Sequence, residues 1–61
     1  MPVVQVHLWS GRTEEQVKEI IEGITEVFVK MGSKPESVRV LVQDYPKTHW
    51  GMGGKPASEK N

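Results

Sequence analysis

The first segment of the chain alternates between two sets of positions. A period of two is that of a β-strand, because successive side chains of a strand point to opposite faces. The segment from Pro2 to Trp9 is therefore predicted to be a strand. One face carries Val4, Val6 and Leu8, and the other carries Val3, Gln5, His7 and Trp9.

The next segment repeats its apolar positions with the period of a helix. Thr13 and Gln16 have the spacing of a capping box, in which each side chain bonds the other residue's backbone and opens a helix. The helix is expected to end at Gly32, which suits a C-terminal cap, and Pro35 prevents its continuation. The apolar stripe of this helix consists of Val17, Ile20, Ile21, Ile24, Val27, Phe28 and Met31.

A second alternating segment follows from Val38 to Asp44 and predicts a second strand. Strand, helix and strand form one β-α-β unit, whose two strands should be parallel with a right-handed crossover. The tail from Tyr45 to Asn61 is rich in glycine and proline and is expected to form a loop and a short hairpin. We expect a single α/β (α+β) domain over residues 1–61.

One helix can cover only one face of a two-stranded sheet. The opposite face, which includes Val3, Trp9 and Leu41, would remain open in a monomer. A chain of 61 residues without cysteine has a thin core and no disulfide to reinforce it. We therefore expect subunits to join their sheets edge to edge and to pack these open faces together.

The composition narrows the classes of partner. Eight basic residues balance eight acidic ones, which argues against nucleic acid or an anionic membrane as partner. His7 and His49 lack the spacing of a zinc site, so no metal is expected. The absence of cysteine, of a secretory leader and of a long apolar run favours a cytoplasmic protein.

Pro2 is the first candidate for chemistry. Proline is tolerated at the start of a strand, where no backbone donor is needed, and this alone would explain it. If Met1 is removed, however, Pro2 becomes a secondary amine on a rigid ring. An α-amino group ordinarily has a pKa of about 7.7–8.0, and nearby cations or an apolar pocket would lower it. Such a group could act as a base at neutral pH.

Two arginines occupy positions that structure alone does not explain. Arg12 lies just before the helix, where a cation is mildly unfavourable, and it is either a solvated loop residue or a carboxylate-binding group. Arg39 interrupts a valine-rich strand on the face expected to be packed by a neighbour. It forms either a structural ion pair or a planar fork for an anionic substrate at a subunit boundary.

The aromatic residues and histidines have weaker signals. Trp9 and Met52 are interpreted as core or interface residues. Trp50 lies in a glycine-rich loop and could form the apolar wall that keeps an amine neutral. His7 and His49 are interpreted as structural or solvated groups, and Tyr45 receives no role.

Pro2 stands at the start of the first strand, Gly11-Arg12-Thr13 precedes the helix, Val38-Arg39-Val40 lies in the second strand, and the run from His49 to Gly54 lies in the tail. Together and in this order, these four pieces resemble the 4-oxalocrotonate tautomerase family of the tautomerase superfamily. The resemblance covers the whole chain. It implies β-α-β subunits with a C-terminal hairpin, paired into dimers with four-stranded sheets and assembled as a homohexamer of three dimers.

The resemblance also implies a cofactor-independent isomerase that converts 2-hydroxymuconate, or a similar 2-hydroxydienoate, to its conjugated ketone. Pro2 would be the general acid/base and Arg12 would bind the distal carboxylate. Arg39 of a neighbouring subunit would hold the 2-oxo acid end. Trp50 would line the pocket where the family usually has phenylalanine, and the backbone N–H of Trp9 would add an oxyanion contact.

Some features depart from the family pattern and keep alternatives open. The segment before the second strand is about one residue short, Ser10 stands where an acid is expected, and Trp50 is larger than phenylalanine. The same machinery could act on another substrate in a biosynthetic pathway, or the chain could be a non-catalytic, oligomeric carboxylate-binding module. Hydration of haloacrylates is the weaker enzymatic interpretation, because the run from His49 to Gly54 contains no acid.

Overall fold

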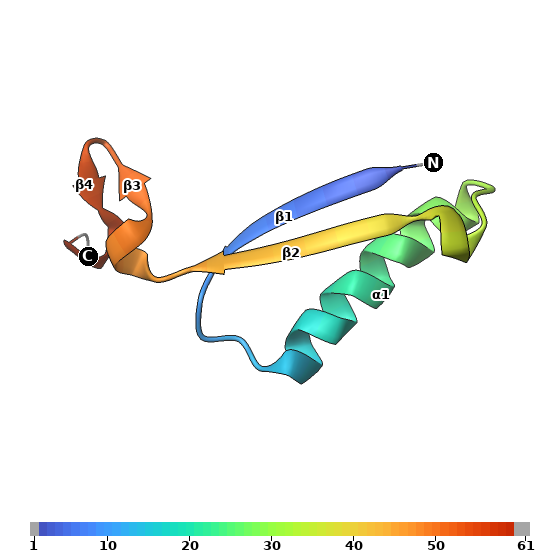
Figure 1. The fold of residues 1–61 in the computed structure, drawn as a ribbon, viewed down its shortest axis with the longest axis horizontal. Helices are drawn as coiled ribbons and strands as arrows, with labels where there is room; N and C mark the ends of the chain where they lie inside the picture. Colours follow the sequence, from blue (N-terminus) through green and yellow to red (C-terminus); the bar gives the residue numbers. More distant parts are fainter. Residues whose placement is uncertain (1, 60–61) are drawn as a thin grey trace.

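A computed structural model describes residues 2–59 of the chain. The chain runs through strand β1 (Val3–Trp9), helix α1 (Glu14–Lys30), strand β2 (Arg39–Tyr45) and a hairpin of β3 (Gly51–Met52) and β4 (Lys55–Pro56). Three 3₁₀ turns, Pro35–Ser37, Lys47–His49 and Ala57–Glu59, connect or end these elements. The expected β-α-β unit with a C-terminal hairpin is confirmed (Figure 1).

β1 and β2 pair in parallel, from Val3 opposite Arg39 to Trp9 opposite Tyr45. Each strand begins one residue later than its sequence predicts, and β2 also ends one residue later, at Tyr45. Pro2 precedes β1, although its carbonyl still accepts from the Arg39 N–H at 3.0 Å. Val38 precedes β2, because its N–H bonds the Pro35 carbonyl at 3.2 Å and closes the 3₁₀ turn.

Helix α1 begins as its sequence predicts and is capped one residue before the expected Gly32. The Thr13 side chain accepts from the Gln16 N–H at 3.1 Å, and the Gln16 side chain accepts from the Thr13 N–H at 3.0 Å, which completes the capping box. At the other end Met31 is the cap residue and Gly32 follows it with φ of 107°. The N–H groups of Gly32 and Ser33 bond back to the Val29 and Phe28 carbonyls, so the last turn closes on itself.

The core is thin, as the length of the chain suggests. Of the described residues, the buried hydrophobic ones are Val38, 8 % exposed, and Ala57, 5 % exposed. The helix packs beneath β2 (Figure 1). Its apolar stripe is only partly covered, because a sheet of two strands is narrower than the stripe. Val17, Ile20, Ile24 and Phe28 are half-buried, whereas Ile21, Val27 and Met31 are exposed.

The sheet face opposite the helix is open, as expected. Val3 is 56 % exposed and Leu41 is 52 % exposed. The hairpin lies beyond the end of the sheet, with positive φ at Gly53 and Gly54 as a tight two-residue turn requires (Figure 1). The molecule is consequently elongated, with a Cα radius of gyration of 14.5 Å. A compact chain of this length would have roughly 10.5 Å.

Candidate active site

The candidate residues lie at opposite ends of one chain. Pro2 and Arg39 lie where β1 and β2 begin, whereas Arg12, Trp9 and Trp50 lie near the end where both strands finish. Figure 1 shows the start of β1 at one end of the sheet and the hairpin at the other. The six steps along β1 separate these ends by roughly 20 Å, because a strand rises about 3.3 Å per residue. Pro2, the expected base, and Arg12, the residue expected to bind the distal carboxylate, therefore do not meet within one chain.

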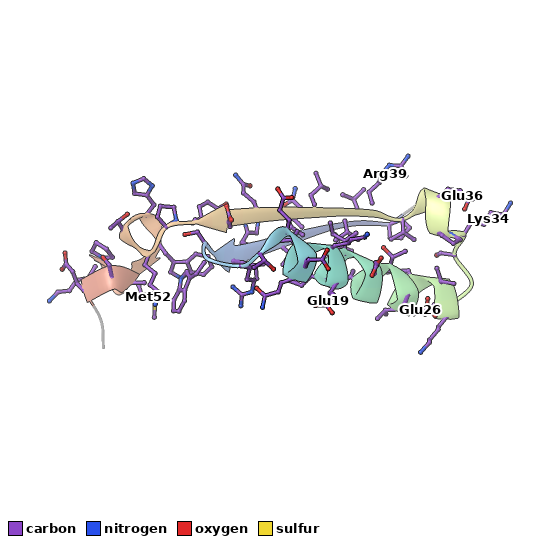
Figure 2. The ribbon with its side chains drawn as sticks, turned by 90° about the horizontal axis from the view of Figure 1, so that it is seen from below. Glu19, Glu26, Lys34, Glu36, Arg39 and Met52 are labelled. Carbon is purple, nitrogen blue, oxygen red and sulfur yellow. The ribbon has the colours of Figure 1, made fainter. Side chains whose placement is uncertain are left out.

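At the first end, Arg39 stands beside the start of β1 in its own chain. Its backbone N–H bonds the Pro2 carbonyl, and its guanidinium donates from Nη1 to the Glu36 carbonyl. The side chain is exposed and points away from the helix (Figure 2). A carbonyl bond occupies one of the five N–H donors of a guanidinium, so the remaining donors can bind an anion. Met1, whose removal would free the Pro2 nitrogen, lies outside the described residues.

At the second end, Trp9 is the centre of a group of contacts. Arg12 donates from Nη1 to the Trp9 carbonyl at 3.3 Å, which holds the arginine against the end of β1. Lys47 Nζ lies 4.7 Å from the centroid of the Trp9 ring, in a cation–π contact. The rings of Trp9 and Trp50 meet edge to face with centroids 6.0 Å apart. Two cations and an aromatic wall are thus gathered at one position.

The backbone N–H of Trp9 points away from β2. In a parallel ladder alternate residues of one strand bond the partner strand. The Pro2 carbonyl accepts from Arg39, and the Ser10 N–H donates to the Tyr45 carbonyl at 2.7 Å, so the even-numbered residues of β1 face β2. The odd-numbered Trp9 consequently turns its N–H to the open edge of the sheet. This orientation is compatible with the oxyanion contact expected from the sequence.

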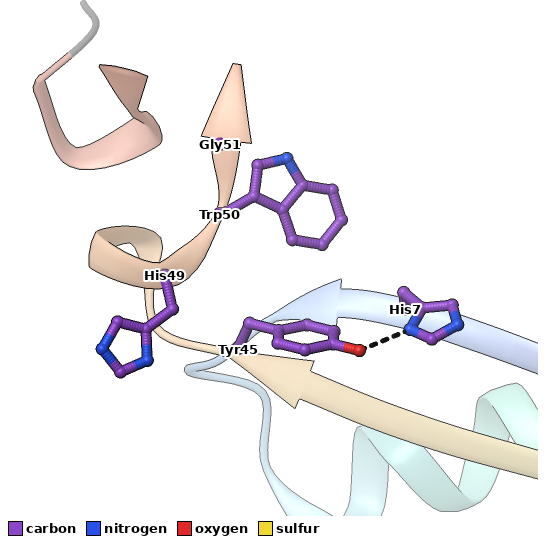
Figure 3. Close-up of a pocket in the computed structure, with 5 residues that line it drawn as sticks. All are labelled: His7, Tyr45, His49, Trp50 and Gly51. Carbon is purple, nitrogen blue, oxygen red and sulfur yellow. Dashed lines mark hydrogen bonds between the residues drawn. The ribbon is translucent and has the colours of Figure 1, made fainter. Parts of the chain in front are cut away.

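A pocket of about 400 Å³ opens beside Trp50 on the same end of the sheet (Figure 3). The pocket is lined by His7, Tyr45, His49, Trp50 and Gly51. Its floor is aromatic, because the Tyr45 ring meets Trp50 edge to face at 5.8 Å and stacks with the His7 ring at 5.7 Å. A hydrogen bond of 2.7 Å joins His7 Nδ1 to the Tyr45 hydroxyl.

Sequence reasoning missed the partnership of His7 with Tyr45. Both residues have odd numbers on strands whose odd positions share the open face, which is a signal that the sequence carries. The register was needed as well, since His7 lies opposite Gln43 and reaches Tyr45 diagonally. Trp50 lines this pocket and is half-buried, whereas Met52 is 40 % exposed in the single chain.

Residues 2–59, the described part of the chain, contain neither a cluster of metal-ligating side chains nor a helix that could span a membrane. No group of three or more His, Cys, Asp or Glu side chains could hold a metal ion there. Within the same range, no helix is long and apolar enough to cross a membrane.

Comparison with known proteins shows one consistent relationship. A family model described as "Tautomerase enzyme" matches residues 2–60. The 2-hydroxymuconate tautomerase of Pseudomonas sp. (strain CF600) is 42 % identical over 60 residues, which cover 97 % of this chain and 95 % of that protein.

Solved structures agree with the sequence comparison. TomN, a 4-oxalocrotonate tautomerase homologue in the tomaymycin biosynthetic pathway, has a TM-score of 0.89 at 32 % identity, covering 95 % of this chain and 91 % of that one. A heterohexamer 4-oxalocrotonate tautomerase from Chloroflexus aurantiacus J-10-fl has a TM-score of 0.86 at 26 % identity, with both chains covered completely.

Proposed function

The chain belongs to the tautomerase family of isomerases, and we propose that it converts 2-hydroxymuconate, or a closely similar 2-hydroxydienoate, to the conjugated ketone. The observation that carries this substrate is the 42 % identity, over nearly the whole length of both chains, to a 2-hydroxymuconate tautomerase. The site adds chemical support. It offers two arginines, Arg12 and Arg39, that can bind the two carboxylates of the substrate.

In the proposed reaction the amine of Pro2, freed by removal of Met1, takes the hydroxyl proton of the dienol and returns it to carbon. A general acid/base with a pKa near the working pH is the most effective one for such a transfer. Arg12 binds the distal carboxylate, and Arg39 holds the 2-oxo acid end and stabilises the charge that develops on oxygen. Trp50 and the N–H of Trp9 complete the pocket.

The site requires more than one subunit under this proposal. Roughly 20 Å separates the two ends of the sheet within one chain. The end that carries Trp9, Arg12 and Trp50 would therefore have to lie against the Pro2 end of another chain's sheet. The first expectation, that a neighbouring subunit lends Arg39, stays a prediction: within a single chain Arg39 stands next to Pro2.

The surface of the single chain supports assembly. Its accessible area is 4869 Å², whereas a compact folded monomer of this mass would expose roughly 4,000 Å². The open edge of β1 and the exposed face around Leu41 are the surfaces that a second copy would cover. We propose dimers with four-stranded sheets, assembled into a homohexamer of three dimers. The name of the Chloroflexus relative describes a heterohexamer, so co-assembly with a second gene product is the alternative composition.

A second candidate is the same chemistry on a different substrate. TomN, which shares the fold closely, works in a biosynthetic pathway, and Trp50 gives this chain a bulkier pocket wall than phenylalanine would. Turnover of 2-hydroxymuconate compared with phenylenolpyruvate separates the two candidates. Preference for the monocarboxylate would favour the second.

The test of the proposal is ketonisation of 2-hydroxymuconate by the wild-type chain and by Pro2→Ala. We expect the variant to lose at least about 100-fold in kcat/KM, since general acid–base catalysis contributes that much or more. Light scattering should show the same assembly for both proteins. Unchanged turnover in Pro2→Ala would refute the proline mechanism. A wild-type chain of correct size that turns over neither 2-hydroxymuconate nor phenylenolpyruvate would leave a carboxylate-binding module as its function.

A further inference from the structure

The pairing of His7 with Tyr45 has no place in the chemistry described so far. The hydroxyl of Tyr45 lies 2.7 Å from His7 Nδ1, and the two rings are stacked with an angle of 23° between their planes. Figure 3 shows the phenol directed along the sheet toward His7, with Trp50 above it. The imidazole therefore fixes the direction of the hydroxyl, while the edge-to-face contact with Trp50 fixes the ring.

This pair supplies a polar group to an otherwise aromatic pocket. His49 also lines the pocket, but Figure 3 shows its ring turned away from Tyr45 and Trp50. The pocket volume of about 400 Å³ is within the range that holds a small organic ligand. A ligand lying against Trp50 would consequently meet the Tyr45 hydroxyl.

The pair can serve as a hydrogen-bond donor or as an acceptor without a change in charge. If His7 Nδ1 carries its proton, it donates to the Tyr45 oxygen and leaves the phenol proton for a ligand. If His7 Nδ1 is bare, the phenol donates to it and the Tyr45 oxygen can accept from a ligand. The imidazole tautomer selects between these two arrangements.

One group of a 2-hydroxydienoate needs a hydrogen-bond acceptor before the reaction and a hydrogen-bond donor after it. Its C2 oxygen is a hydroxyl in the enol and a carbonyl in the ketone, so it donates in one tautomer and only accepts in the other. The carboxylates only accept, and arginines suit them better. We infer that the Tyr45 hydroxyl, positioned by His7, hydrogen-bonds the C2 oxygen of the substrate. The inference rests on the proposed function and adds a specificity-determining residue to it.

The test measures binding of two unreactive ligands that differ in this oxygen. Adipate and 2-oxoadipate are both six-carbon diacids, and the second carries a carbonyl at C2. Isothermal titration calorimetry gives the ratio of their dissociation constants for the wild-type assembly and for Tyr45→Phe, which keeps the ring against Trp50. We expect the preference for 2-oxoadipate to fall about fivefold to tenfold in the variant, the value of one hydrogen bond.

Two further variants control the experiment. In His7→Leu the phenol remains but loses its partner, so the preference should fall in the same direction by a smaller factor. Thr48→Val removes a hydroxyl from the same loop outside the pocket and should leave the preference unchanged. Equal weakening of both ligands in Tyr45→Phe would mean a structural role, and an unchanged preference would mean no contact. Either result overturns the inference.

The outcome can be separated from the fate of the proposed function. Turnover of 2-hydroxymuconate by the wild-type chain, lost in Pro2→Ala, establishes the reaction without reference to Tyr45. If that turnover is present while Tyr45→Phe keeps the wild-type preference for 2-oxoadipate over adipate, only the inference about Tyr45 is wrong. If the wild-type chain binds neither diacid and turns over no dienol, both are wrong.

Discussion

Replacement of Leu41 by alanine tests whether the open sheet face is a subunit interface. Leu41 lies in the middle of β2 and is 52 % exposed in the single chain, so about half of its burial remains to be gained by association. Its side chain points away from the helix, and its removal leaves the contacts between α1 and the sheet intact. The variant should therefore fold and assemble less tightly.

The expected size follows from this exposure. Full burial of a leucine side chain contributes about 1.5–3 kcal/mol, so covering the exposed half contributes about 1 kcal/mol per subunit. In a hexamer six such losses are distributed over five association steps. Because 1.4 kcal/mol corresponds to a factor of ten, the concentration at half-assembly should rise about tenfold.

Sedimentation velocity over a dilution series measures that concentration for wild-type, Leu41→Ala and Met31→Ala. Met31 caps the helix and is 75 % exposed, so its truncation removes apolar surface away from the sheet face and should shift assembly less than twofold. If Leu41→Ala assembles like the wild-type chain, or if Met31→Ala shifts assembly as strongly, the open face is not the interface.

Three further substitutions test local elements. Thr13→Ala removes the helix cap and should lower the free energy of unfolding by about 1 kcal/mol per subunit in chemical denaturation, whereas Thr13→Asp should retain most of it. Gly32→Ala forces a side chain into positive φ, with open space around it, and should cost about 1–2 kcal/mol in the same assay. Arg12→Ala should raise KM for 2-hydroxymuconate about tenfold to a hundredfold with little effect on phenylenolpyruvate; equal effects on both substrates would contradict a role at the distal carboxylate.

The elements of the fold were predictable because local signals agree along this chain. The capping box at Thr13, the glycine after Met31 and the alternation of the two strands each depend on neighbouring residues. The strand limits shifted by one residue because backbone bonds, such as that of Val38 to Pro35, decide them. The exposure of Val27 and Met31 could not be predicted from the stripe, since it depends on the width of the sheet above the helix.

The candidate site was predictable in its residue types and less so in its geometry. A terminal proline and two unexplained arginines stand out in the sequence alone. The placement of Arg39 beside Pro2 in the same chain follows from the register of the parallel strands, which side-chain patterns do not specify. The pairing of His7 with Tyr45 depends on the same register and was missed for the same reason.

The central claim is that the free amine of Pro2 performs the proton transfer. Intact mass spectrometry of the purified protein, made on the same sample as a 2-hydroxymuconate assay, tests it most directly. The account predicts that an active sample has the mass of a chain without Met1, because a retained methionine would turn the Pro2 nitrogen into a non-basic amide. Full activity in a sample whose mass includes Met1 would contradict it.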